Sequence, residues 1–356
     1  MKQIYKDLMT LPGISSHENR IRDYFISFIN DNKNYEIRKD NLGSVFAYKK
    51  STKKDAKTVM VAAHMDEVGL MVSKIEKNGG IRVLPIGGLL GEVFISTVVY
   101  VYTNDGKEIP GVIGSVPPHL KVGNKVDIES LLVDIGANSK EEVINLGIRL
   151  GDMVLFKTPY LETFNEENFI AKSIDNRFGC ALALEAISYF NNKDLEFNLA
   201  IGATVQEEVG LRGAKTSVNM IKPDLFIALD ASPVNDLYDQ SFDVKLGKGF
   251  LLRVFDPRNI MPQHLMTYFI DLANKNKIDY QPFISKGGTD AAMAHNMHEG
   301  IVSTTIGLPA RYIHSTAAMA SYKDVSSARS MLYALINDLT NEKIMKLKGG
   351  DKIEIL

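Results

Sequence analysis

The sequence is poor in the residues on which several classes of protein depend. It holds one cysteine among 356 residues, so no disulfide can form within the chain, and a reducing compartment, the cytoplasm, is expected. That residue, Cys180, lies in the apolar run RFGCALALEAI, where we expect it to fill the core and not to act as a nucleophile. Tryptophan is absent, which removes the side chain best suited to stacking on sugar rings.

Long apolar runs and a strong net charge are missing as well. No stretch reaches the roughly 20 apolar residues of a membrane span, and the N-terminal segment MKQIYKDLMTLPGISS lacks the apolar core of a signal peptide. The formal net charge is −2, which argues against nucleic acid or an acidic membrane surface as the main partner. With 45% hydrophobic and 24% charged residues, the composition is that of an ordinary globular protein.

The hydrophobic pattern divides the chain into an outer unit and an insertion. Residues 1–69 contain a helical pattern at 17–30 and a buried strand at 58–66, and helices and strands alternate again over 163–356. Residues 70–162 instead hold short β-prone runs broken by glycine and proline, which indicates a small β-rich barrel or sandwich. We therefore expect an α/β fold, with a mostly parallel sheet covered by helices and a β-rich domain inserted into it. The later elements are expected as helices at 177–190, 261–276 and 324–340 and strands at 198–205, 224–229 and 301–306.

Polar side chains recur where these elements begin or end. They are His64 and Asp66, Asp175, the adjacent Glu207 and Glu208, Asp230, and His314. In open α/β sheets, sites form beyond the carboxyl ends of the strands, so segments distant in sequence can converge there. Two histidines and several carboxylates at such an edge predict a metal site, with ligands enough for two ions.

Each of these residues also has an ordinary structural interpretation. Asp175 can cap the helix at 177–190, and Asp230 can end a strand at a turn. One of the two glutamates can cap a helix after Gly210, and the histidines can be satisfied polar residues at strand ends. The prediction of a metal site fails only if all of these structural interpretations are correct at the same time.

The motifs AAHMDEVG, DNR, QEEVGLRGA, LDASP, KGGTDAA and ARYIHS together resemble a known family. Their order and spacing resemble the tetrahedral, or TET, metallo-aminopeptidases, which include bacterial glutamyl aminopeptidases and archaeal deblocking aminopeptidases. The resemblance extends from the N-terminal helix to beyond His314. It implies an enzyme that releases N-terminal residues from peptides. It also implies that the insertion is a PDZ-like dimerisation domain, and that dimers form the edges of a hollow tetrahedral dodecamer.

The resemblance assigns the metal ligands residue by residue. Asp175 would bridge two divalent ions. His64 and Asp230 would complete one ion, and Glu208 and His314 would complete the other. Zinc, cobalt and manganese all suit mixed imidazole and carboxylate ligands, which do not choose among them.

The resemblance also implies catalytic and substrate-binding roles. Glu207 would be the general base and acid, and Asp66 would hold the imidazole of His64 from behind. The blocks VQEEVGLRGA, DASP and KGGTDAA look closest to the glutamyl aminopeptidases, which implies a preference for N-terminal Glu or Asp. An acidic side chain in a partly dry pocket needs a cation, and Lys286 and Arg258 are the candidates near these blocks. The turn at 287–290 either shapes this pocket or only caps the next helix.

Three alternatives remain open at this point. The enzyme can be a broad or leucine-preferring aminopeptidase of the same family. It can be a glycoside hydrolase, since members of the family have been labelled endoglucanases, although glycosidases use two carboxyls and no metal. A non-catalytic, peptide-binding scaffold with structural metals is the third, but structural zinc sites are usually rich in thiolates.

Overall fold

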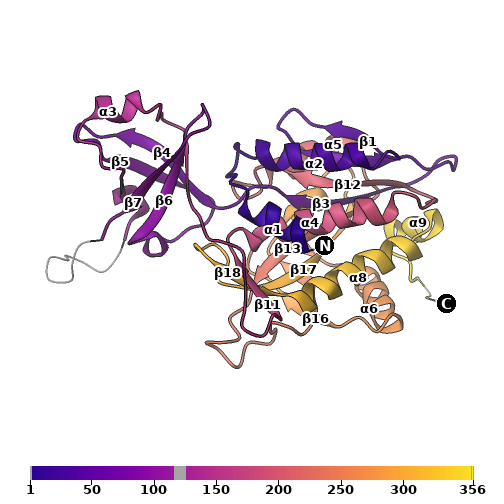
Figure 1. Ribbon diagram of the computed structural model, residues 1–356. Coiled ribbons are helices and arrows are strands. Elements are labelled where there is room, and N and C mark those ends of the chain that lie inside the picture. Colours follow the sequence, from indigo (N-terminus) through magenta and orange to yellow (C-terminus); the bar gives the residue numbers. More distant parts are fainter. Residues whose placement is uncertain (1, 116–125, 354, 356) are drawn as a thin grey trace.

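The computed structural model describes residues 2–115, 126–353 and 355. These residues form an α/β body and a smaller β-barrel that stands to one side of it (Figure 1). The α/β class predicted from the sequence is therefore confirmed. None of the helices in this part of the chain is both long and apolar enough to span a bilayer. His119, which we expect at the surface from its loop sequence, lies outside the described residues.

The helices of the described residues include the four that were predicted from the sequence. They are α1 (Lys2–Thr10), α2 (Asn19–Asp31), α3 (Lys140–Asn145), α4 (Ile174–Phe190), α5 (Arg212–Ile221), α6 (Gln263–Lys275), α7 (Asp290–His295), α8 (Tyr322–Asp338) and α9 (Asn341–Gly349). The helices predicted at 17–30, 177–190, 261–276 and 324–340 correspond to α2, α4, α6 and α8. Cys180 is buried inside α4, as predicted.

The larger sheet is mixed, with a parallel centre. Its strands are β1 (Glu36–Lys39), β2 (Val45–Lys49), β3 (Thr58–His64), β10 (Leu161–Glu162), β11 (Asn168–Ala171), β12 (Asn198–Thr204), β13 (Leu225–Pro233), β14 (Phe250–Asp256), β15 (Asn259–Ile260), β16 (Tyr280–Ile284), β17 (Val302–Arg311) and β18 (Ala318–Ser321). The central order β12-β3-β13-β17 is parallel throughout, whereas β2, β14 and β18 join this centre antiparallel. The expectation of a mostly parallel sheet therefore holds for the centre and is wrong for the flanks.

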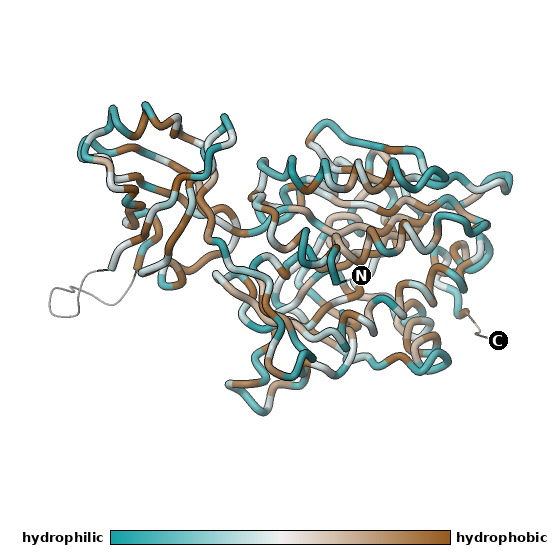
Figure 2. The backbone as a smooth tube through the Cα atoms, in the orientation of Figure 1, coloured by the Kyte–Doolittle hydropathy of each residue, from teal (hydrophilic) through white to brown (hydrophobic). Residues whose placement is uncertain are grey.

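The central strands are buried on both faces. In β3, Val59, Val61 and Ala63 pack in the core that includes α1, α2, α4, α6 and α8, while Met60 and Ala62 pack with α5 and α7 on the other face. This alternation follows from the period of two along a strand. The central strands accordingly carry hydrophobic residues almost continuously (Figure 2). The helix layers keep the sheet dry and leave its carboxyl edge open for a site.

The barrel follows β3 directly and has a core of its own. Its strands are β4 (Gly69–Ile75), β5 (Ile81–Ile86), β6 (Thr97–Tyr102), β7 (Glu108–Ile113), β8 (Leu132–Asp134) and β9 (Met153–Phe156). They close in the order β4-β5-β8-β7-β6-β9, with β9 pairing both β4 and β6. The interior residues, among them Val83, Val99 and Val133, form a hydrophobic cluster separate from the main core.

Candidate metal centre

The segments that carry the predicted site residues meet at the carboxyl end of the central strands. They are the end of β3 with His64, the start of α4 with Asp175, the turn after β12 with Glu207 and Glu208, β13 with Asp230, and the turn after β17 with His314. Parallel neighbours end at the same sheet edge, so these distant segments are brought together as the strand pattern predicted.

His64, Asp175 and Asp230 form a first group of potential metal ligands. The Nε2 atom of His64 lies 3.1 Å from Oδ1 of Asp175 and 3.5 Å from Oδ1 of Asp230. One donor atom from each residue lies within 4.8 Å of the others, and His64 and Asp230 are buried. A nitrogen and two carboxylate oxygens so close together can hold one divalent cation.

Asp175, Glu208 and His314 form a second group beside the first. The Nε2 atom of His314 lies 3.4 Å from Oδ2 of Asp175 and 3.6 Å from Oε1 of Glu208. Asp175 therefore belongs to both groups and turns a different carboxylate oxygen toward each histidine. Its side chain contacts the two imidazoles, while the N-cap position of α4 is occupied by Ser173.

Both imidazoles are oriented by contacts on the side away from the carboxylates. The Nδ1 atom of His64 lies 3.0 Å from the backbone oxygen of Asp66, and Nδ1 of His314 lies 2.8 Å from the backbone oxygen of Gly88. A carbonyl can only accept a hydrogen bond, so Nδ1 of each neutral ring is the protonated nitrogen. The Nε2 lone pairs then face the shared carboxylates, which is the orientation that metal ligation requires.

A third group includes Glu207, the predicted general base. His64, Glu207 and Glu208 also have donor atoms within 4.8 Å of one another. However, Oε2 of Glu207 lies 4.0 Å from Nε2 of His64, farther than either carboxylate of the first group. Geometry therefore allows Glu207 either to remain free or to act as a ligand.

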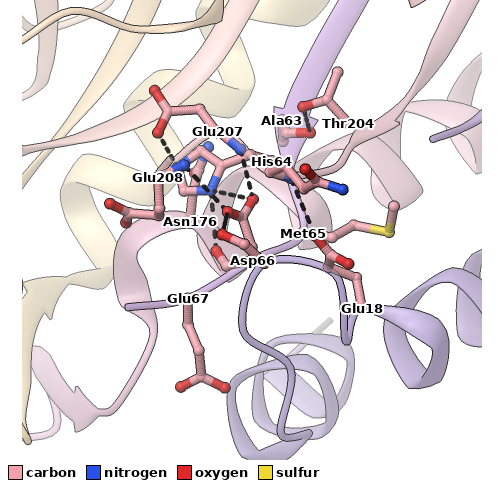
Figure 3. A network of polar contacts seen from close by, with 12 residues as sticks. Glu18, Ala63, His64, Met65, Asp66, Glu67, Asn176, Thr204, Glu207 and Glu208 are labelled. Carbon is pink, nitrogen blue, oxygen red and sulfur yellow. Dashed lines mark hydrogen bonds and ion pairs between the residues drawn. The ribbon is translucent and has the colours of Figure 1, made fainter. Parts of the chain in front are cut away.

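Asp66 contacts both the His64 imidazole and the turn that carries the two glutamates. Its backbone carbonyl contacts the His64 imidazole, whereas its Oδ1 atom is 3.5 Å away from Nδ1. Its two carboxylate oxygens also accept hydrogen bonds from the backbone N–H groups of Glu207, at 3.0 Å, and Glu208, at 3.1 Å. Figure 3 shows Asp66 below His64 and the two glutamates, with dashed lines for its polar contacts.

A buried ion network fixes the chain on either side of Asp66. The Glu67 carboxylate points away from the metal groups (Figure 3) and pairs with Lys172, at 2.7 Å from Nζ to Oε2. The fully buried guanidinium of Arg177 donates to the backbone oxygens of Leu8, Leu11, Gly13 and Met65. The arginine of the DNR motif thus ties the segment after β3 to α4 and to the end of α1.

The charges of the site leave several of its groups with strongly shifted pKa values. Burial and the nearby Asp175 carboxylate raise the pKa of Glu208 to about 8. Burial alone lowers the pKa of His314, but the Asp175 and Glu208 carboxylates outweigh it and raise that pKa to about 9. Burial also raises the pKa of Glu207 well above its usual range. Such clustering of carboxylates favours a bound cation, which competes with protons for the same atoms.

The metal groups open into a cavity of about 330 Å³. Its lining consists of His64, Asp175, Glu207, Glu208, Asp230, Ala231, Pro233, Arg253, Ser285, Gly287, Gly288, Ile313 and His314. The two glycines belong to the turn predicted at 287–290, and Thr289 caps α7, so the turn has both of the roles that the sequence left open.

Arg253 is the cation in this cavity, and it was missed from the sequence. It is buried, and its guanidinium donates to Oγ of Ser232 at 2.6 Å and to the backbone oxygen of Gly287 at 3.2 Å. Its buried Nε atom has no hydrogen-bond partner in the described part of the chain. Lys286 and Arg258 are exposed and lie outside the cavity lining, although Arg258 passes close to Gly288.

The chain is similar to known aminopeptidases over nearly its whole length. Residues 43–331 match the sequence model described as M42 glutamyl aminopeptidase. The glutamyl aminopeptidase of Lactococcus lactis is 40% identical, covering 97% of this chain and 98% of that one. The lysyl aminopeptidase of Pyrococcus furiosus is 35% identical, covering 95% and 97%.

A solved structure extends the agreement to three dimensions. The TET1 peptidase of Pyrococcus horikoshii, described as able to assemble into a tetrahedron or a large octahedral shell, matches with a TM-score of 0.86 and 30% identity, covering 95% of this chain and 99% of that one. The resemblance drawn from the sequence motifs is thereby confirmed. The chain belongs to the M42 glutamyl aminopeptidase family and is an aminopeptidase, a hydrolase of peptides.

Proposed function

We propose that the enzyme uses two divalent metal ions that share Asp175. The observation that carries this proposal is the placement of Asp175, with Oδ1 toward His64 and Oδ2 toward His314. His64 and Asp230 would complete one coordination sphere, and Glu208 and His314 the other. The donors are imidazole and carboxylate, which suit zinc, cobalt or manganese. When bound, the ions would polarise the scissile carbonyl and lower the pKa of the attacking water.

Glu207 is the residue that moves the proton in this proposal. Its carboxylate would take a proton from the attacking water and return it to the amine that leaves, a shuttle worth about 10²–10⁴-fold. Two features support this division of labour between the paired glutamates. Glu208 belongs to the ligand group of Asp175 and His314, whereas Glu207 belongs to neither group that contains Asp175, and burial raises the pKa of Glu207 above its usual range.

Arg253 supports the predicted preference for N-terminal Glu or Asp. A carboxylate that enters the cavity loses water, so its binding requires a charged hydrogen-bond donor in return. Arg253 lines the cavity, and its contacts with Ser232 and Gly287 fix its guanidinium there as a positive charge. The nearest carboxylate, that of Asp256, is 3.9 Å from the guanidinium. The relatives are glutamyl and lysyl aminopeptidases, so their names alone leave the preference open.

The assembly is proposed to be a tetrahedral dodecamer built from dimers. The barrel, with the expected bounds of 70–162, would be the PDZ-like dimerisation domain inserted into the catalytic domain of 1–69 and 163–356. Two kinds of observation support this. Paired residues Val98 and Val112 expose apolar side chains on neighbouring barrel strands, and the similar TET1 peptidase is described as forming a tetrahedron. Light scattering that shows a stable monomer across metal and pH conditions would contradict it.

A substrate panel tests the function itself. Aminoacyl p-nitroanilides of Glu, Asp, Leu, Ala and Lys should be hydrolysed in the order set by Arg253, with Glu and Asp first, and a chelator should abolish turnover. A leucine preference would remove the acidic assignment and leave an aminopeptidase. Hydrolysis of cellulose that persists in the presence of the chelator would favour the glycosidase alternative. No turnover of either the p-nitroanilides or cellulose would favour the non-catalytic, peptide-binding scaffold. A cytoplasmic location remains a prediction from the single cysteine.

A further inference from the structure

The turn that carries the paired glutamates is held by buried carboxylates at three successive backbone positions. The N–H of Gln206 donates to Oε1 of Glu18 at 3.0 Å. The next two N–H groups, of Glu207 and Glu208, donate to the two oxygens of Asp66 at 3.0 and 3.1 Å. Figure 3 shows Glu18 and Asp66 on the same side of this turn, below Glu207 in this view, and neither residue is in the cavity lining. We call the contact of Glu18 with Gln206 the Glu18 clamp.

The backbone at the start of this turn adopts a conformation that its sequence does not favour. Gln206 has a φ of +55°, in the left-handed region where the Cβ of a non-glycine residue is crowded. Such conformations persist where the surroundings determine them, and they concentrate at active sites. The left-handed residue reverses the chain immediately after β12, so that Glu207 and Glu208 both project into the metal site. The Glu18 clamp acts on that residue.

The position of Glu18 is unusual for an acidic residue at a helix terminus. Glu18 occupies the N-cap position of α2, yet its side chain makes no capping hydrogen bond to that helix. It is instead 4% exposed, and its contact with Gln206 joins residues 188 positions apart. Burying a carboxylate is costly unless hydrogen bonds compensate for the water it loses. The burial of Glu18 therefore indicates that its hydrogen bond to Gln206 has a specific role. Helix α2 is not capped by the Glu18 carboxylate.

We propose that Glu18 is a positioning residue for catalysis, because it holds the left-handed turn that aims Glu207 at the reacting atoms. This inference rests on the proton-shuttle role proposed for Glu207. Glu18 touches neither the substrate cavity nor the metal groups, so its loss should slow the proton transfer and leave substrate binding unchanged. Misplacing a catalytic group by about 1 Å can cost on the order of 100-fold in rate.

Two substitutions of Glu18 separate positioning from general stability. Glu18→Met keeps the length of the side chain but removes the acceptor, whereas Glu18→Gln keeps an oxygen that can accept from the Gln206 N–H. We expect Glu18→Met to lower kcat about 10- to 100-fold with KM nearly unchanged, and Glu18→Gln to recover most of the lost rate. Metal content, measured by mass spectrometry of the intact holoenzyme, should be unchanged in both. If Glu18→Met does not fold, Glu18→Ala provides the same comparison.

Hydrogen–deuterium exchange reports on the clamp independently of turnover. The amides of the segment 205–211 should exchange faster in Glu18→Met than in the wild type, and at the wild-type rate in Glu18→Gln. The matched control is Asp324, a buried carboxylate that accepts from the N–H groups of Gly247 and Gly249, both at 2.7 Å, and that lies outside the cavity lining. Asp324→Leu should lower the melting temperature and leave the kcat of the folded enzyme unchanged.

The outcomes distinguish this inference from the function on which it rests. Faster exchange in Glu18→Met together with a kcat near that of the wild type would overturn the positioning role. The positioning role would also be overturned if kcat fell in Glu18→Met only in proportion to a loss of metal. An equal fall of kcat in Asp324→Leu would overturn it as well. If Glu207→Gln retained full turnover, the shuttle would be wrong whatever the Glu18 variants did. Slow kcat, intact metal and recovery in Glu18→Gln would establish the clamp.

Discussion

The Nδ1 atom of His314 lies 2.8 Å from the backbone oxygen of Gly88, a residue 226 positions earlier in the chain. Gly88 follows β5, so a turn of the barrel reaches into the second metal group of the α/β body. The preceding residue, Gly87, has a φ of +86°, and a Cβ there would lie 2.7 Å from Val68 and 3.1 Å from Oε2 of Glu208. The barrel is therefore in contact with two of the proposed ligands.

A side chain at position 87 should weaken the binding of one of the two metal ions. Gly87→Ala would displace Glu208 and the turn that orients His314, so we expect about one ion per chain to remain at limiting metal concentration. Gly151→Ala is the matched control, because Gly151 has a φ of +91° but nothing within 4 Å of its added Cβ. Both variants strain the backbone, and only Gly87→Ala should lose metal. Equal occupancy in the two variants, measured by metal analysis, would contradict the role of the turn.

The shared carboxylate makes a different prediction about metal content. Asp175→Asn retains the shape of the side chain but removes the charge that faces both histidines, so both ions should be lost. Asp230→Asn should affect only the ion held with His64, because Asp230 belongs to a single group. Titration of each variant with cobalt, followed by its absorption spectrum, would check this. If Asp175→Asn retained one ion, the two ligand groups would not share the Asp175 carboxylate.

Metal binding should strengthen as the pH rises toward 9. In the absence of metal, Glu208 binds a proton below a pKa of about 8, and His314 below about 9. Both must lose that proton before they can ligate, so protons compete with metal, and affinity falls as the pH falls through these values. Calorimetric titrations at pH 7 in buffers of different ionisation enthalpy should show proton release, which should decrease as the pH rises through 8 and 9. A metal affinity that is constant from pH 6 to 9 would refute this assignment.

Substitution of the candidate cations should identify which one selects acidic substrates. Arg253→Met should lower kcat/KM for a Glu substrate about 10- to 100-fold, as expected for a lost charged hydrogen bond, with far less effect on a Leu substrate. The Leu substrate serves as the internal control for damage to the site. Lys286→Ala and Arg258→Ala test the two cations predicted from the sequence. A selective loss in Lys286→Ala alone would place the acidic side chain outside the cavity that Arg253 lines.

Residues at strand ends could be predicted because their pattern is local. A buried strand that runs straight into His64, or into Glu207 and Glu208, is visible in the sequence, and the rule for parallel sheets then places such ends together. The direction of the flanking strands was not visible in this way. Strands such as β14 and β18 pair antiparallel with β17 through contacts that depend on the whole sheet.

The supporting residues were missed because their signals exist only in three dimensions. Arg253 lies within FLLRVFD, where an arginine in an alternating strand normally faces solvent. Glu18 begins a helix, where an acidic residue is expected for electrostatic reasons alone. Gly87 and Gly88 are typical of any turn. Glu18 contacts Gln206, 188 positions away. Arg253 contacts Ser232, a residue of the neighbouring strand β13, and that contact exists only once β13 and β14 are placed in the sheet.

The division of labour between Glu207 and Glu208 is the centre of this account, and one variant tests it most directly. The kcat and metal content of Glu207→Gln should be measured on the same holoenzyme preparation. The account predicts that both ions are retained while kcat falls at least about 100-fold, because the amide cannot carry the proton. Near-normal turnover with metal bound, or loss of a metal ion as expected of a ligand in the group formed with His64 and Glu208, would contradict it.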